Sequence, residues 1–463
     1  MLLRHVILLL LLFCPSIVLG ASQDSYLVPS PIRGLSAERS LPDSQLPHIK
    51  PSMLTAGFWI ARHPSVDKII MTPRQIDAFN ANIRDHLKLT KDIFSLVDHF
   101  QTESLMDVFK RDIGSFTNKG YYTIKGIQDD NDFLDKVRNT MYLSGVVLGI
   151  EPRYGLVIHL AAQRVLPTVE GLYAHKGDID FDELQNSALD VASPVAIVHQ
   201  SQDGKWYYVF SALSDGWVQA DNVAIGDMNS VKNFMQTKDF VVITSSKADL
   251  FLDQQMTQFD DYARMGVKFP LLEENDNQWV VQIPVKGKDN QLQLVKGYIP
   301  KTQAHQGYLP YSARTIYEQA FLMLDKPYGW GDMYGQQDCS RFLQMVYATV
   351  GIELPRDSRN QAQVGQELAS FDEKATNKER LDSLRNALGA LTILPMKGHI
   401  MLYLGMADGV PFAIHDTSGY SKLRHGIQIK YVLNRVVVSD LSLGEDSAKG
   451  SLLRRLSKIV GIQ

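Results

Sequence analysis

The stretch Asp338-Cys339-Ser340-Arg341-Phe342 contains one of the two cysteines in this 463-residue chain. The other, Cys14, lies in an apolar N-terminal segment of the kind that is removed on export. Cys339 would then be the single thiol of the mature protein, which excludes an internal disulfide. A buried, inert cysteine is the plainer interpretation. The polar neighbours Asp338 and Ser340 favour a reactive one.

The residues after Cys339 predict a helix. Apolar side chains recur at a spacing of four: Phe342, Val346 and Val350. Gly351 then supplies a common helix stop. Cys339 would thus lie at a helix N-terminus, where the free N–H groups and the helix dipole favour a thiolate over a thiol. The pattern predicts a nucleophilic cysteine.

Two histidines follow in surroundings typical of strands. His399 opens one apolar run, and His415 closes the next, with turn residues between the runs. On an antiparallel hairpin, we expect both imidazoles on one face if the loop has an odd number of residues, such as 405–409 or 407–409. The pair would then supply a base and its orienting partner for the thiol. The alternative for each histidine is a structural one, either hydrogen-bonded in the core or exposed at the surface.

Length and charge limit the remaining possibilities. A chain of 463 residues is too long for one ordinary core, and the formal net charge of −4 comes without a basic cluster, so no nucleic-acid partner is expected. The apolar run within residues 1–20 is too short to span a bilayer, and no later segment predicts a membrane span. Residues 1–20 predict a signal peptide, and we expect an exported protein of the periplasm or cell envelope.

The rest of the chain divides by texture. Residues 21–149 predict a Pro-rich extended arm followed by a mainly helical module. Two β-rich segments, 150–228 and 235–305, share a plan in which a Trp-led strand precedes a Gly-aromatic strand, which predicts a tandem repeat. Residues 310–440 carry the thiol and both imidazoles, and 441–463 are expected as a C-terminal tail.

Taken in chain order, the motifs resemble those of the NlpC/P60 family of cell-wall cysteine peptidases. The matching motifs are Pro327-Tyr328-Gly329-Trp330-Gly331, Asp338-Cys339-Ser340, Leu354-Pro355-Arg356-Asp357-Ser358 with Gln361, Gly398-His399-Ile400 and Ile414-His415. The β-rich segments resemble the bacterial SH3-type barrels of one subgroup. The resemblance implies an α+β fold: a papain-like NlpC/P60 catalytic domain, preceded by two small SH3-like β-barrels and the N-terminal mainly helical module.

The resemblance also implies a reaction. Its substrate would be a peptidoglycan stem peptide, cut between γ-D-glutamate and a diamino acid such as meso-diaminopimelate by a monomer without metal or organic cofactor. Cys339 would be the nucleophile, His399 the general base and His415 the group that orients it. Tyr328 would stabilise the oxyanion together with the backbone N–H of Cys339.

In similar SH3-bearing members, the residues beside the cysteine bind the free amine of an N-terminal L-alanine, a role that would fall to Asp338 and Ser340. Two departures stand out, because many members have glycine where this chain has Arg341 and Asp332. They predict a bulkier, charged groove rim. Two other functions remain open: a wall-binding protein with an inactive peptidase domain, and a zinc site built from the same cysteine and histidines, which would lack a fourth ligand.

Overall fold

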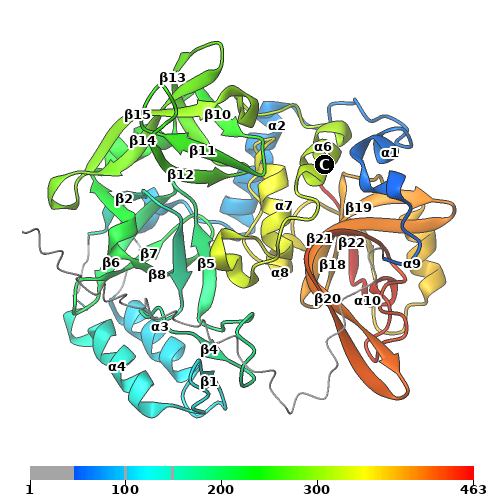
Figure 1. The fold of residues 1–463 in the computed structure, drawn as a ribbon, viewed down its shortest axis with the longest axis horizontal. Coiled ribbons are helices and arrows are strands. Elements are labelled where there is room, and N and C mark those ends of the chain that lie inside the picture. The colour runs from blue at the N-terminus through cyan, green and yellow to red at the C-terminus, as the bar shows by residue number, and fades with distance from the viewer. Residues whose placement is uncertain (1–45, 99–101, 147–150) are drawn as a thin grey trace, which may run out of the picture. The chain divides into compact units, whose positions relative to one another are not determined.

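A computed structural model describes residues 46–98, 102–146 and 151–463 (Figure 1). The expected signal peptide and most of the Pro-rich arm fall outside these ranges. Within them, no helix has both the length and the apolar character needed to cross a membrane.

The first β-domain is a sheet of seven antiparallel strands. They are β2 (Arg153–Val157), β3 (Ala161–Arg164), β5 (Gln185–Leu189), β6 (Pro194–Gln200), β7 (Trp206–Phe210), β8 (Asp215–Gln219) and β9 (Val223–Gly226). Their spatial order is β5-β3-β8-β7-β6-β2-β9. Its core includes Trp217, which is completely buried.

The second β-domain is also a sheet of seven antiparallel strands. They are β10 (Phe240–Ile243), β11 (Lys247–Phe251), β12 (Phe259–Arg264), β13 (Lys268–Glu274), β14 (Gln278–Lys286), β15 (Leu292–Pro300) and β16 (Ala304–Gln306). Their order, β12-β11-β15-β14-β13-β10-β16, repeats the first sheet strand for strand. Trp206 and Trp279 lie on β7 and β14, which are each the fifth strand of their sheet in chain order. This shared topology supports the interpretation of a tandem repeat.

The C-terminal domain packs helices against a six-stranded sheet. Its strands are β17 (Gln366–Ser370), β18 (Thr392–Met396), β19 (His399–Ala407), β20 (Val410–Arg424), β21 (Ile427–Asp440) and β22 (Lys458–Gly461), in the order β17-β22-β18-β19-β20-β21. Its helices are α6 (Ala313–Leu322), α7 (Cys339–Ala348), α8 (Ser358–Gln361), α9 (Asn377–Leu384) and α10 (Leu452–Arg455). Helix α7 contacts β19 and β20. Its apolar face, predicted from the spacing of four, is fully buried.

Residues 441–463 do not form a tail. They contribute α10 and then β22, which lies between β17 and β18 inside the sheet. Ile459, Val460 and Ile462 are at most 2% exposed. This short apolar run buries itself as an inner strand, and the domain therefore extends beyond the expected boundary at residue 440.

The hairpin that carries the two histidines has a different loop from the expected one. Strands β19 and β20 are joined by two residues, Asp408 and Gly409, both with positive φ, as an Asp-Gly type I′ turn requires. An even loop alone would place the imidazoles on opposite faces. A bulge, seen as a register shift between Tyr403 and Gly405, restores the shared face.

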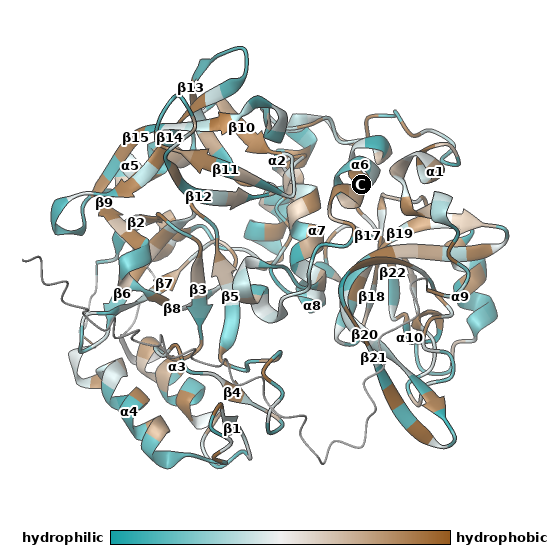
Figure 2. Ribbon diagram, in the orientation of Figure 1, coloured by the Kyte–Doolittle hydropathy of each residue, from teal (hydrophilic) through white to brown (hydrophobic). Residues whose placement is uncertain are grey.

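The helices expected as one N-terminal module do not share a core. The first part comprises α1 (Ala56–Ile60) and α2 (Pro73–Ala81), and the second comprises α3 (Thr102–Gly114) and α4 (Asn131–Met141). The first part buries Trp59 and Ile76 in the core of the C-terminal domain. The second buries Phe109 against Trp217 of the first β-domain. Hydrophobic and hydrophilic residues mix on α3 and α4 (Figure 2), as expected for helices that cover another element.

Candidate active site

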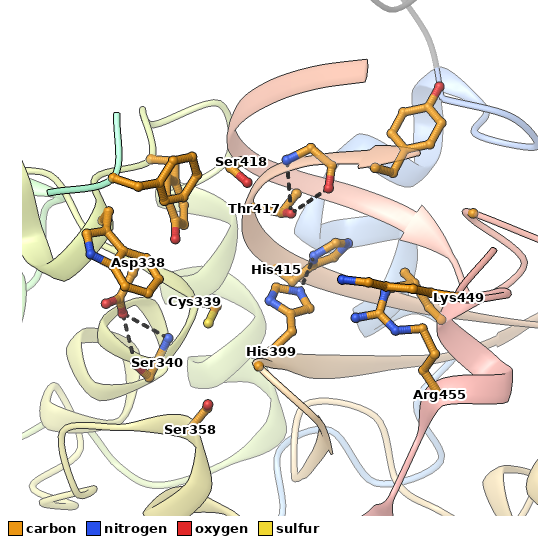
Figure 3. A pocket seen from close by; sticks show the side chains of 18 of the residues that line it. Asp338, Cys339, Ser340, Ser358, His399, His415, Thr417, Ser418, Lys449 and Arg455 are labelled. Carbon is orange, nitrogen blue, oxygen red and sulfur yellow. Dashed lines mark hydrogen bonds between the residues drawn. The ribbon is translucent and has the colours of Figure 1, made fainter. Parts of the chain in front are cut away.

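Cys339 is the first residue of α7, as the sequence predicted. Asp338 caps the helix, because its Oδ1 accepts hydrogen bonds from the backbone N–H groups of Ser340 at 3.1 Å and Arg341 at 2.9 Å. Cys339 lines a pocket of about 900 Å³. The other five predicted site residues line the same pocket: Tyr328, Asp338, Ser340, His399 and His415. Figure 3 shows Cys339 and His399 facing each other across it.

The two histidines form the expected pair. Nε2 of His399 lies 2.8 Å from Nδ1 of His415, and Nε2 of His415 lies 3.0 Å from Oγ of Ser439 on β21. For His399 to accept the thiol proton at Nδ1, its Nε2 must carry a hydrogen and donate it to His415. His415 then donates from Nε2 to Ser439. Sequence reasoning missed Ser439, since no local motif marks a serine 24 residues beyond His415.

Burial keeps the thiol and the imidazoles neutral. Burial and the charge of Asp338 raise the pKa of Cys339 to about 12. Burial and the charge of Arg455 lower the pKa of His399 to about 4, and burial also lowers the pKa of His415. The thiolate that we expected from the helix N-terminus is therefore not favoured, because burial and the charge of the capping carboxylate both outweigh the helix dipole. The resting pair is a thiol beside a neutral imidazole.

Tyr328 remains a hydrogen-bond donor. Burial, with the nearby Cys339 and Asp338, raises the pKa of its hydroxyl far above the usual value. In the part of the chain that the structure describes, that hydroxyl donates to no protein group. The backbone N–H of Cys339 is likewise not among the amides that Asp338 caps. Both donors therefore belong to residues that line the pocket and are not engaged by these protein groups.

Arg356 occupies much of the hydrogen-bonding capacity of Asp338. Its guanidinium donates to Oδ1 at 3.2 Å, to Oδ2 at 2.9 Å and to Oγ of Ser340 at 3.1 Å. Burial would raise the pKa of Asp338, but Arg356 lowers it overall, so the carboxylate is ionised. Oδ1 accepts four hydrogen bonds, whereas Oδ2 accepts one. The remaining acceptor position of Asp338 is thus on Oδ2.

Arg356 belongs to a buried cluster of charges where α7 meets both β-domains. The cluster contains three carboxylates and three guanidiniums, each at most 9% exposed: Asp190, Asp332, Asp338, Arg264, Arg341 and Arg356. Asp190 of the first β-domain binds Arg264 of the second at 2.6 Å and also pairs with Arg341 of α7. Pairing opposite charges in equal number offsets part of the penalty for burying them. The cluster joins three domains beside the nucleophile.

The two departures from the family pattern both lie in this cluster. Asp332 binds Arg356 at 3.2 Å and accepts from the backbone N–H of Ala188, and its Oδ2 lies 3.6 Å from Nε of Arg341. Neither Asp332 nor Arg341 lines the pocket. The prediction of a charged groove rim is therefore wrong, because both side chains turn away from the pocket into the domain interface.

Several pocket residues had no signal in the sequence. The first β-domain supplies a few of them, and the others come from α8, β20 and the segment before β22: Phe181, Asn186, Ser358, Thr417, Ser418, Lys449 and Arg455. Lys449 and Arg455 fall in the segment expected as a tail. Among the described residues, no three Cys, His, Asp or Glu side chains are grouped to hold a metal ion. The nitrogens that join His399 and His415 already face each other, which does not suit the zinc alternative.

Comparison with known families fits this geometry. Residues 325–437 match the sequence model of the NlpC/P60 family, and residues 172–219 match that of an SH3 domain of the SH3b1 type. The NlpC/P60 family consists of cysteine peptidases, which generally act on the cell wall. No curated protein matches the chain.

One solved structure has a similar fold over most of this chain. An NlpC/P60 endopeptidase from Photobacterium damselae subsp. piscicida is 20% identical, with a TM-score of 0.73 over 88% of this chain and 96% of that chain. An NlpC/P60 family protein from Bacillus cereus ATCC 10987 is 16% identical, with a TM-score of 0.45 over 66% of this chain and 98% of that chain. The first likeness extends beyond residues 325–437 to most of the upstream fold.

Proposed function

We propose that this protein is an exported cysteine endopeptidase that hydrolyses peptidoglycan stem peptides between γ-D-glutamate and meso-diaminopimelate. The observation that carries the proposal is the line Cys339, His399, His415 and Ser439, which runs from a helix N-terminus through two bonded imidazoles in one pocket. The match of residues 325–437 to the NlpC/P60 family supports this chemistry and this substrate class.

The reaction would begin from the neutral thiol of Cys339 and the neutral imidazole of His399. Nδ1 of His399 takes the proton of the Cys339 thiol while Sγ attacks the γ-glutamyl carbonyl carbon. The carbonyl oxygen becomes an oxyanion, to which the backbone N–H of Cys339 and the hydroxyl of Tyr328 donate. His415 stabilises the imidazolium of His399 through its bonded Nδ1. The thiolate–imidazolium pair therefore forms only as charge develops on the carbonyl oxygen. Activation of the thiol thus depends on bound substrate.

The second half of the reaction releases both products. The imidazolium of His399 gives its proton to the departing amine, the C–N bond breaks, and a thioester remains on Cys339. Water, deprotonated by the same imidazole, then attacks the thioester carbon. The acid product leaves, and the thiol recovers its proton. Every proton transfer uses one nitrogen of one side chain.

Recognition of a free N-terminal L-alanine would use Oδ2 of Asp338, the oxygen with acceptor capacity left. Since Arg356 already neutralises this carboxylate, the attraction for an ammonium comes from a directed hydrogen bond more than from net charge. Ser340, whose hydroxyl donates to Asp338 at 2.8 Å, would mainly hold that carboxylate in place. We expect a preference for stems already freed from glycan.

The test compares L-Ala-γ-D-Glu-meso-diaminopimelate with the same stem still attached to muramic acid. Products are followed by mass spectrometry for the native protein, for Cys339→Ala and for Ser418→Ala, a pocket variant outside the catalytic line. The proposal predicts L-Ala-γ-D-Glu from the native protein and from Ser418→Ala, faster with the free stem, and none from Cys339→Ala. Binding of both stems without any product would contradict the proposal and favour a wall-binding protein.

A further inference from the structure

The pocket has a second charged wall, formed by the segment before β22. Arg455 ends α10, and Lys449 lies in the loop that precedes this helix; both line the pocket with Cys339. In Figure 3 their side chains enter on the side of His399, opposite Asp338. Arg455 acts electrostatically on His399, which places its charge close to the catalytic imidazole.

Neither cation has an acidic partner. Across the described ranges, no carboxylate lies within ion-pair distance of Arg455 or Lys449, and the guanidinium of Arg455 makes no hydrogen bond with protein atoms. Arg455 is nevertheless partly buried, and burial alone lowers its pKa. A half-buried guanidinium with five unused donors is costly unless a ligand supplies the acceptors.

The location of these cations determines which part of a substrate meets them. His399 protonates the departing amine in the proposed reaction, so the leaving amino acid lies on the His399 side of Cys339. We propose that Arg455, assisted by Lys449, is a binding subsite for the side-chain carboxylate of the leaving amino acid. This inference rests on the proposed function and adds a specificity determinant to it.

The subsite would sort stem peptides by their diamino acid. Diaminopimelate carries a carboxylate on its side chain, whereas lysine at the same position ends in an ammonium alone. A guanidinium binds a carboxylate through two parallel N–H···O bonds, and it repels an ammonium. The wall therefore favours leaving residues with an additional carboxylate and disfavours lysine.

The experiment uses four stem peptides that differ only in the leaving residue: meso-diaminopimelate, its side-chain amide, its α-carboxamide and L-lysine. The value of kcat/KM is measured for the native protein, Arg455→Gln, Arg455→Lys and Lys449→Ala. Arg454→Gln is the matched control, since Arg454 is the exposed neighbour on the same helix and does not line the pocket.

We expect Arg455→Gln to lower kcat/KM for the diaminopimelate stem by about ten-fold or more, the usual scale for a lost charged hydrogen bond. The loss should be much smaller for the side-chain amide and for the lysine stem, which both lack the side-chain carboxylate, than for the α-carboxamide, which keeps it. Arg455→Lys should recover part of the activity, Lys449→Ala should lose less, and Arg454→Gln should match the native protein.

The outcomes separate the two proposals. If the native protein cuts none of the four stems, the proposed function fails. If it cuts them and Arg455→Gln lowers kcat/KM equally for all four, the carboxylate subsite is overturned, and Arg455 acts only through His399 or through the fold. A loss confined to stems with the carboxylate supports the subsite.

Discussion

The two sides of the pocket use charge in opposite ways. Beside α7, three carboxylates and three guanidiniums pair with one another across three domains, and two of them, Asp338 and Arg356, line the pocket. On the opposite wall, Arg455 and Lys449 face the same pocket with no acidic partner among the described residues. Charges that are paired within the protein fix its geometry, whereas charges left without partners are available to a ligand. The comparison predicts large structural effects on the first wall and substrate-dependent effects on the second.

The largest effect is expected from Arg356→Met. This change leaves Asp332 and Asp338 buried with fewer counter-charges, which we expect to lower the free energy of unfolding by about 3–5 kcal/mol. Activity should fall as well, because Asp338 caps the helix that carries Cys339. Urea unfolding measures the first effect, and kcat/KM measures the second. Arg359→Met, on the exposed side of α8, is the control. If both variants are equally stable, the paired charges beside α7 do not have the structural role that the comparison assigns to them.

A smaller effect is expected where the cluster joins the domains. Asp190→Asn and Arg341→Met, made singly and together, form a double-mutant cycle across the interface of the first β-domain and α7. Because the two side chains are ion-paired, we expect a coupling of about 1–3 kcal/mol in the free energy of unfolding. Additive losses would show that this pair does not hold the domains together.

The charge cluster also shows what the sequence could not reveal. Asp190 lies 151 residues before Arg341, and nothing near Arg341 indicates a partner in another domain. The family pattern marked Arg341 and Asp332 as departures but gave the wrong location for them. By contrast, the helix start at Cys339 and the strand settings of His399 and His415 depend on local spacing, which a sequence records directly.

The hairpin shows the same limit at shorter range. The sequence predicted that His399 and His415 share a face, yet it could not predict that a bulge near Leu404 would compensate for an even turn. Residues 441–463 were expected as a tail because no motif marks them. Their short apolar run folds between strands that lie far earlier in the chain, so Arg455 was not foreseeable as a pocket residue.

Ser439→Ala tests the far end of the catalytic line. Without this hydroxyl, the Nε2–H of His415 loses its acceptor, and the orientation of His399 becomes less fixed. We expect kcat to fall by about five-fold, corresponding to about 1 kcal/mol, with little change in KM. Ser439→Thr, which keeps the hydroxyl, should retain most of the activity. A change in KM alone would show that Ser439 does not belong to the catalytic line.

The smallest expected effect is a shift in pH dependence. His399 must be neutral to take the thiol proton, and its pKa of about 4 keeps it neutral far below the usual range of histidine. The value of kcat/KM should therefore hold as pH falls and be lost as pH passes through about 4. Arg455→Gln removes a positive charge that lowers this pKa, so the acid limb should move to higher pH. If the acid limb does not move, the charge of Arg455 does not affect the pKa of His399.

The most direct test of the central claim is hydrolysis of L-Ala-γ-D-Glu-meso-diaminopimelate in water enriched in oxygen-18. If Cys339 forms a thioester with the γ-glutamyl group and water resolves it, one labelled oxygen enters L-Ala-γ-D-Glu, and the released diaminopimelate stays unlabelled. Cys339→Ala should yield no product under the same conditions. Label in the diaminopimelate, or an undiminished rate in Cys339→Ala, would contradict the assignment of bond and nucleophile.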